Sequence, residues 1–247
     1  MMDNSLPAHS VPPRFPVPPP RVVVIMPALN EAAAIGQVLA EIPPWLGAKV
    51  IVCDNGSTDA TPRIARSAGA LVVTETRRGY GAACQRALAH LPPETDIVVF
   101  LDADHSDFPE DMPRLLAPIQ QGNADLVIGS RTLGQAEPAA LLPHQRFGNW
   151  LATALIRLIW GHAYSDLGPF RAIRRTSLQH LAMGDRDYGW TVEMQIRALQ
   201  AGLRVVEVPV RYRPRIGVSK ISGTLASSVR AGIKILHVVF RHAIAKS

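Results

Sequence analysis

Short apolar runs alternate with stretches of helical periodicity along the first half of the chain. Five runs rich in β-branched residues predict buried strands, and they span residues 21–27, 49–54, 70–75, 96–104 and 124–131. Helices are predicted after the first four, at residues 30–42, 57–69, 79–91 and 109–121. Asn30 is the expected N-cap of the first helix, and Ser57 or Thr58 that of the second.

This alternation of strands and helices predicts an α/β protein with a doubly wound, mostly parallel sheet. The runs are apolar throughout, as expected for strands that are covered on both faces. Ligands of such sheets bind outside the carboxyl ends of the strands. Polar residues gather at those ends, in residues 27–31, 54–59, 102–107 and 129–131. The sequence therefore predicts a binding site at this edge of the sheet.

The second half of the chain is less regular. We expect a helix at residues 147–160, a strand at 169–173, a helix at 191–202 and one or two strands within 203–212. The tail is amphipathic, with Leu225, Val229, Ile233, Leu236 and Phe240 forming an apolar stripe and Arg230, Lys234, His237 and Arg241 a basic one. The predicted domain thus covers residues 21–223, followed by a basic amphipathic helix at 224–247.

Composition excludes several classes of protein. With 47% hydrophobic residues in 247, most of the chain is too apolar to be disordered. The proline-rich residues 1–20 lack the apolar core of a secretory signal, so we expect a disordered leader there. The apolar stretches best suited to cross a bilayer are interrupted, one by Arg157 and one by Lys234 and His237.

Cysteine usage and charge indicate the redox compartment and the kind of partner. The two cysteines lie in apolar or helical contexts typical of free buried thiols, which favours a reducing compartment and excludes a disulfide scaffold. The net charge of +6 favours an acidic partner: nucleotide phosphate, anionic lipid or nucleic acid. Aromatic and basic residues are not interleaved as in single-strand binders, so we expect no nucleic acid.

Asp102 and Asp104 lie at the carboxyl end of the predicted strand at residues 96–104. Carboxylates at this spacing can address one hard cation, Mg²⁺ or Mn²⁺, which also takes oxygen ligands from phosphates. The alternative is a solvated acidic turn that caps the next helix. The position at a strand's carboxyl end, among other polar strand ends, favours the metal.

Other strand ends carry further candidates. Asp54 also ends a buried strand, where a base-edge N–H could satisfy its carboxylate. Arg78 and Gly79 lie in a glycine-containing turn before a helix, which lets backbone N–H groups approach phosphate. This turn is not a dinucleotide-binding fingerprint, because Cys84 occupies the position of the third glycine.

Basic residues are scattered over the second half, and each alone could be a solvated surface residue. Together they could clamp a second anion opposite the metal; they are Arg131, Arg146, the arginines of residues 211–215, and Ser219 with Lys220. Glu193 could act as a general base, or it could be a first-turn glutamate favoured by the helix dipole.

In this order, the motifs VVIMPALNE, DNGSTD, RGYGAA, FLDADHSD, GSR, DLGPFRAIRR and EVPVRYRPRIGVSK resemble glycosyltransferase family 2 over about residues 21–223. The similarity is greatest to the branch that transfers mannose or glucose to dolichol or polyprenyl phosphate. It implies a GT-A fold and an inverting, metal-dependent transfer from a nucleotide sugar. Membrane hairpins that some members carry at the C-terminus are missing from this sequence.

The resemblance also implies roles for individual residues. Pro27, Ala28 and Glu31 would line the nucleotide, Asp54 would read the base, and Arg78 with Gly79 would lie beside it. Asp102 and Asp104 would hold Mg²⁺ or Mn²⁺, while Arg131 and Arg146 would meet the acceptor phosphate. Arg215, Ser219 and Lys220 would belong to a loop over the donor. Ser106 stands where the branch usually has a glutamine ligand, so the full coordination set stays open.

The expected function is hexose transfer from GDP-mannose or UDP-glucose to a polyprenyl phosphate, by an enzyme bound peripherally to the cytoplasmic face of a membrane. A phosphate acceptor needs no strong base. One alternative is a hydroxyl acceptor with Glu193 as base, and another is a nucleotide-binding module without catalysis.

Overall fold

The computed structural model describes residues 20–138, 140–217 and 225–244, without the side chains of residues 225–230. The predicted leader therefore lies outside the described residues. Within them one sheet contains β1 (Val22–Ala28), β2 (Lys49–Asp54), β3 (Leu71–Thr74), β4 (Ile97–Phe100), β5 (Leu126–Ser130), β6 (Arg171–Arg174) and β7 (Val205–Pro209). The helices are α1 (Ile35–Glu41), α2 (Thr61–Ser67), α3 (Tyr80–Leu88), α4 (Met112–Gln120), α5 (Pro143–Trp160), α6 (Arg175–His180), α7 (Trp190–Gln200) and α8 (Leu225–Ile244), with short 3₁₀ turns η1 (Pro44–Leu46) and η2 (Pro109–Asp111).

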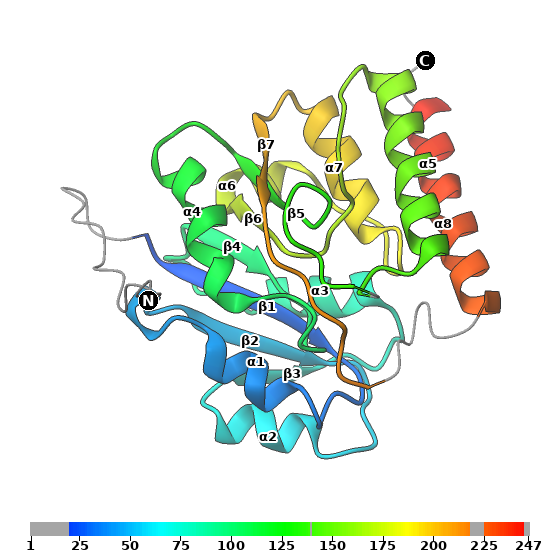
Figure 1. The fold of residues 1–247 in the computed structure, drawn as a ribbon. Helices are drawn as coiled ribbons and strands as arrows, with labels where there is room; N and C mark the ends of the chain where they lie inside the picture. The colour runs from blue at the N-terminus through cyan, green and yellow to red at the C-terminus, as the bar shows by residue number, and fades with distance from the viewer. Residues whose placement is uncertain (1–19, 139, 218–224, 245–247) are drawn as a thin grey trace, which may run out of the picture.

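The strand order is β3-β2-β1-β4-β6-β5-β7 (Figure 1). All neighbouring strands are parallel except β6, which runs antiparallel to both β4 and β5. This confirms the predicted doubly wound, mostly parallel sheet. Since β1, β2, β4 and β5 are parallel, their carboxyl ends meet at one edge.

Helices cover both faces of the sheet, as the uniformly apolar strands predict. On one face, alternate β1 residues such as Val23 and Ile25 pack against α3, α5, α7 and α8. On the other, Val24 and Met26 pack against α1, α2 and α4. The two layers of core hold the strand ends, and hence the polar residues on them, at fixed positions.

Two predicted helix starts are wrong. Asn30 has a left-handed backbone (φ 53°), and α1 begins only at Ile35, after Ala34 as N-cap. The helix α2 begins at Thr61. The polar residues instead connect the two strand-end loops, because Ser57 accepts the backbone N–H of Asn30 (2.9 Å) and the Asn30 side chain accepts that of Thr58 (2.8 Å).

The two long helices α5 and α8 pack side by side (Figure 1). The helix α5 begins at Pro143, four residues before the predicted start, and buries Ala152, Thr153 and Ile156. Other large apolar residues of α5 are turned outward: Leu158 is 81% exposed and Trp150 61% exposed. Both helices thus carry one apolar face inside and apolar side chains outside.

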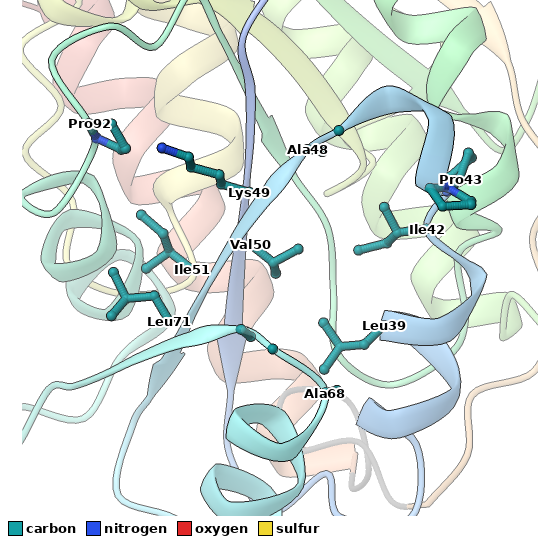
Figure 2. A pocket seen from close by; sticks show the side chains of 14 residues that line it. Leu39, Ile42, Pro43, Ala48, Lys49, Val50, Ile51, Ala68, Leu71 and Pro92 are labelled. Carbon is teal, nitrogen blue, oxygen red and sulfur yellow. The ribbon is translucent and has the colours of Figure 1, made fainter. Parts of the chain in front are cut away.

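A groove of about 480 Å³ lies at the opposite edge of the sheet, where β2 and β3 begin (Figure 2). Aliphatic side chains and prolines line it, among them Leu39, Ile42 and Leu71, and its charged residue Lys49 pairs with Glu94. No set of polar groups converges on it, and it lies away from the carboxyl ends where ligands of such sheets bind. We therefore place the candidate site at the other edge.

Candidate functional site

The carboxyl ends of the central strands open into a pocket of about 320 Å³. Eight of the predicted site residues line it together: Pro27, Ala28, Glu31, Arg78, Gly79, Asp102, Asp104 and Arg215. They come from the ends of β1 and β4, the turn before α3 and the segment after β7. Segments far apart in the sequence thus form one site, because parallel strands end at the same edge.

Asp102 and Asp104 form the acidic centre of this pocket. The Tyr80 hydroxyl donates to Asp102 Oδ1 (3.1 Å), and Asp104 Oδ1 accepts the backbone N–H and the hydroxyl of Ser106. Burial, with the charge of Asp104 beside it, raises the pKa of Asp102 to about 7. The ionised pair therefore needs a cation.

The surrounding charges fit a divalent cation. Asp107 is 1% exposed, and neither of its carboxylate oxygens has a hydrogen-bond partner within the part of the chain that the structure describes. Burial and the charges of Asp102 and Asp104 raise the pKa of Asp107 well above its usual range. In the described part of the chain, no three His, Cys, Asp or Glu side chains are grouped as metal ligands. Two carboxylate ligands suit Mg²⁺ or Mn²⁺, because such an ion takes its remaining ligands from phosphate and water.

Arg215 supplies positive charge at the pocket. Its guanidinium bridges Asp104 (2.9 Å to Oδ2) and Glu31 (2.8 Å to Oε1), and its buried Nε has no hydrogen-bond partner among the described residues. The backbone N–H of Ile216 donates to the carbonyl of Asp104 (2.9 Å), which fixes the segment over the acidic pair. Ser219 and Lys220 lie outside the described residues.

The opposite wall of the pocket is shaped by glycine. Gly79 has φ +142°, and a Cβ there would lie 2.2 Å from the carbonyl oxygen of Arg186. Asn55 holds the turn, because its amide donates to the carbonyls of Glu75 and Arg77 and accepts the N–H of Gly79 (2.8 Å). Asp54 accepts the N–H of Ser57 (3.0 Å) and is not among the lining residues.

Arg131 and Arg146 do not line the pocket. Arg131 makes two side-chain hydrogen bonds to the buried Asp166, at 2.8 and 2.7 Å, and its guanidinium lies 5.0 Å from the ring centroid of Tyr212. Burial alone would lower the pKa of Arg131, but the charge and hydrogen bonds of Asp166 outweigh burial and hold that pKa above its usual value. Arg146 is exposed on α5.

The structure does not bring Glu193 to the pocket either. It is 1% exposed, accepts the N–H groups of Gly184 and Asp185, and pairs with Arg197 at 2.9 Å. Both carboxylate oxygens are engaged inside the protein, and the burial of Glu193 keeps them from a substrate hydroxyl in the pocket. The expectation that it acts as a base for a hydroxyl acceptor therefore has no support in this geometry.

Three lining residues with polar side chains were not among the predicted site residues: Tyr80, Asn55 and Tyr188. Asn55 and Tyr80 belong to the motifs DNGSTD and RGYGAA, so their positions beside Asp54 and Gly79 were the available signal. Tyr188 gave no such signal, because it follows no strand and reaches the pocket only through the packing of residues 184–189 against α3.

Comparisons with known proteins bear on this site. The family model described as glycosyl transferase family 2 matches residues 23–182. An uncharacterised glycosyltransferase of Mycobacterium tuberculosis is 39% identical over 222 residues, covering 88% of this chain and 97% of the relative. A dolichyl-phosphate hexose transferase of Haloferax volcanii is 35% identical over 201 residues (81% and 86%), and an undecaprenyl-phosphate mannosyltransferase of Micrococcus luteus is 31% identical over 216 residues (82% and 88%).

Among solved structures, glucosyl-3-phosphoglycerate synthase from Mycobacterium tuberculosis, in complex with Mn²⁺, UDP and glucosyl-3-phosphoglycerate, matches with a TM-score of 0.73. It is 25% identical, and the match covers 91% of this chain and 80% of that one. A family match over more than half of the chain, with relatives at 31% to 39% identity across more than four fifths of it, shows that the protein belongs to glycosyl transferase family 2 and is a glycosyltransferase of GT-A fold.

Proposed function

We propose that the protein transfers a hexose from a nucleotide sugar, GDP-mannose or UDP-glucose, to a polyprenyl phosphate, with inversion at the anomeric carbon. The observation that carries the proposal is the pair Asp102 and Asp104 beside Arg215 in one pocket at the strand ends. Such a pair matches a diphosphate leaving group bound through a divalent cation. The names of the dolichyl-phosphate and undecaprenyl-phosphate relatives support the lipid acceptor.

On the donor side, Asp102 and Asp104 would hold Mg²⁺ or Mn²⁺, which when bound supplies positive charge to the leaving diphosphate. The solved neighbour with Mn²⁺ and UDP supports this assignment. Arg78, with the backbone of Gly79, would lie against the phosphates. The remaining donor contacts that we propose are Pro27, Ala28, Glu31, Asp54, Arg215, Ser219 and Lys220.

On the acceptor side, a phosphate is ionised at neutral pH and is already a competent nucleophile, so no general base is needed. Arg131 and Arg146 would hold it in line through charge-assisted hydrogen bonds. Arg131 is well suited to this because Asp166 and Tyr212 fix its guanidinium. Glu193 accepts the backbone N–H of Asp185 instead of facing the pocket, which agrees with an acceptor that needs no base.

We further propose that α5 and α8 rest on the cytoplasmic surface of a membrane. Their exposed side chains include large apolar residues, and basic residues lie on the same helices; the apolar ones are Phe147, Trp150, Leu158, Ile233, Phe240 and Ile244, and the basic ones Arg146, Arg157 and Arg241. Among the described residues, no helix combines the length and apolar content that crossing a bilayer requires. A surface-bound helix pair would bring a lipid phosphate to the enzyme.

The test is a panel of donors against acceptors, with released nucleoside diphosphate as the readout. GDP-mannose and UDP-glucose are each combined with a polyprenyl phosphate, with 3-phosphoglycerate and with a polyprenol that lacks phosphate. We expect turnover with the polyprenyl phosphate, none with the polyprenol, and loss of turnover in EDTA.

Asp104→Asn should lower turnover by at least about 100-fold, because it removes charge from the metal site. Asp96→Asn is the matched control, since Asp96 is exposed and pairs with Arg21 at the opposite edge of the sheet. Turnover only with 3-phosphoglycerate would reject the lipid acceptor, and full activity of Asp104→Asn would reject the whole proposal.

A further inference from the structure

Residues 184–189 form the segment between α6 and α7, and they lie directly against the turn that begins α3. The backbone N–H groups of Gly81 and Ala82 donate to the carbonyls of Asp187 (3.3 Å) and Arg186 (2.8 Å). A Cβ on Gly81 would lie 2.2 Å from the carbonyl oxygen of Asp185. Backbone therefore packs on backbone here, and any shift of the segment moves this wall of the donor pocket.

The same segment also contributes to the pocket directly, because Tyr188 is one of the lining residues. Gly189, which follows it, packs against α8: a Cβ there would lie 2.6 Å from Val238. The segment is thus held between the pocket and the C-terminal helix, and neither Gly81 on one side nor Gly189 on the other leaves space for a Cβ.

Two charged contacts hold the segment in place. The Asp185 side chain is buried; its Oδ1 accepts the N–H groups of Asp187 (2.7 Å) and Gly189 (3.1 Å), and its Oδ2 pairs with Lys234 of α8 (2.8 Å). Glu193 of α7 accepts the N–H of Asp185 itself (2.6 Å). A buried carboxylate with a single described cation against it depends strongly on that cation.

We infer that Lys234, Asp185 and Glu193 are positioning residues for the nucleotide donor, acting through residues 184–189 on Tyr188 and on the turn at Gly79. The inference rests on the proposed function, because it assumes that this pocket binds the donor. It assigns a role in donor binding to α8, none of whose described side chains lines the pocket. It also explains why Glu193 is buried and fully hydrogen-bonded without contacting substrate.

The test uses Lys234→Met, which keeps the length of the side chain and removes its charge, and Lys234→Arg, which restores the charge. Affinity for UDP and GDP is measured by calorimetry in the presence of Mn²⁺. We expect the affinity to fall about tenfold in Lys234→Met, as is common for a misplaced binding wall, and to recover in Lys234→Arg. The KM for the acceptor should stay unchanged, which separates a positioning role from a general loss of folded enzyme.

Lys49→Met is the matched control, because Lys49 pairs with Glu94 at the far edge of the sheet. A second readout needs no ligand: amide exchange at Gly81 and Ala82 should accelerate in Lys234→Met and not in Lys49→Met, since their acceptors belong to the segment. If Lys234→Met does not fold, Asp185→Asn provides the same comparison with less change of shape.

The outcomes separate the two ideas. Failure of the unmodified protein to bind either nucleotide overturns the proposed function and the positioning role with it. Binding by the unmodified protein, with equal affinity and equal exchange in Lys234→Met, overturns the positioning role alone.

Discussion

Asp102 and Glu193 show how surroundings decide what a carboxylate does. Asp102 lies beside Asp104 with a single hydrogen bond from Tyr80, so its negative charge is poorly compensated. Glu193 accepts two backbone N–H groups and pairs with Arg197, so its charge is satisfied inside the protein. The first arrangement attracts a cation and the second stabilises the fold.

The raised pKa of Asp102 makes a prediction for the metal-free protein. In the unfolded chain an aspartate titrates near pH 4, but Asp102 in the folded protein titrates at about 7. The native state therefore binds this proton more tightly, and ionisation of Asp102 lowers the free energy of unfolding as the pH rises from about 4 to about 7. Asp102→Asn removes this effect.

In denaturant titrations with EDTA, we expect Asp102→Asn to gain stability relative to wild type as the pH is raised over that range, by on the order of 3 kcal/mol. In Asp96→Asn no such gain should occur, because Arg21 lowers the pKa of Asp96 and the group is ionised throughout. A difference between Asp102→Asn and wild type that stays constant with pH would contradict the raised pKa.

At the scale of elements, the apolar residues of α5 and α8 fall into two groups: some pack into the core and others are exposed. Ala152 and Ile156 of α5 and Val238 and Val239 of α8 pack into the core. Leu158 of α5, with the exposed apolar residues of α8, stays outside. Large apolar side chains that are exposed together on neighbouring helices are typical of an interaction surface, whereas single scattered ones are not.

Vesicle binding tests this surface. We expect the double variant Trp150→Ser with Leu158→Ser to partition onto anionic phosphatidylglycerol vesicles about 10 to 100 times more weakly than wild type, because two large side chains no longer enter the lipid. Leu71→Ser is the matched control, since Leu71 is 52% exposed on the edge strand β3. Equal weakening by the control, or none by the double variant, would argue against the membrane surface.

At the scale of the molecule, the pocket at the strand ends joins segments from both halves of the chain. Its walls come from β1, the start of α3, the end of β4, residues 184–189 and the segment after β7. Ligand binding at such a junction stabilises the folded state as a whole, because the unfolded chain has no pocket.

We therefore expect Mn²⁺ together with UDP or GDP, at about 100 times the dissociation constant, to raise the free energy of unfolding by about 2.7 kcal/mol. Thermal unfolding with both ligands, with each alone and after removal of the metal by EDTA measures this. Asp104→Asn should lose the combined effect. Stabilisation that persists in EDTA would mean that the nucleotide binds without the metal.

Much of this protein follows from local sequence. The five predicted strands appear where the β-branched runs place them, because short, uniformly apolar runs suit strands that helices cover on both faces. The positions of Glu31, Asp102 and Arg78 at the pocket follow from the rule that parallel strands end at one edge. The predicted helix starts at Asn30 and Ser57 were wrong. The Ser57 side chain accepts the backbone N–H of Asn30 and the Asn30 side chain accepts that of Thr58, so neither side chain caps a helix.

The sequence by itself thus determined the α/β sheet, its site edge and the acidic pair, since these depend on periodicity and on contacts close along the chain. Only the tertiary structure decided which charges meet: Arg131 with Asp166, Lys234 with Asp185, and Arg215 over Asp104. These pairs join residues that are distant in sequence, and the free energy of a buried charge depends on the partner that folding places beside it.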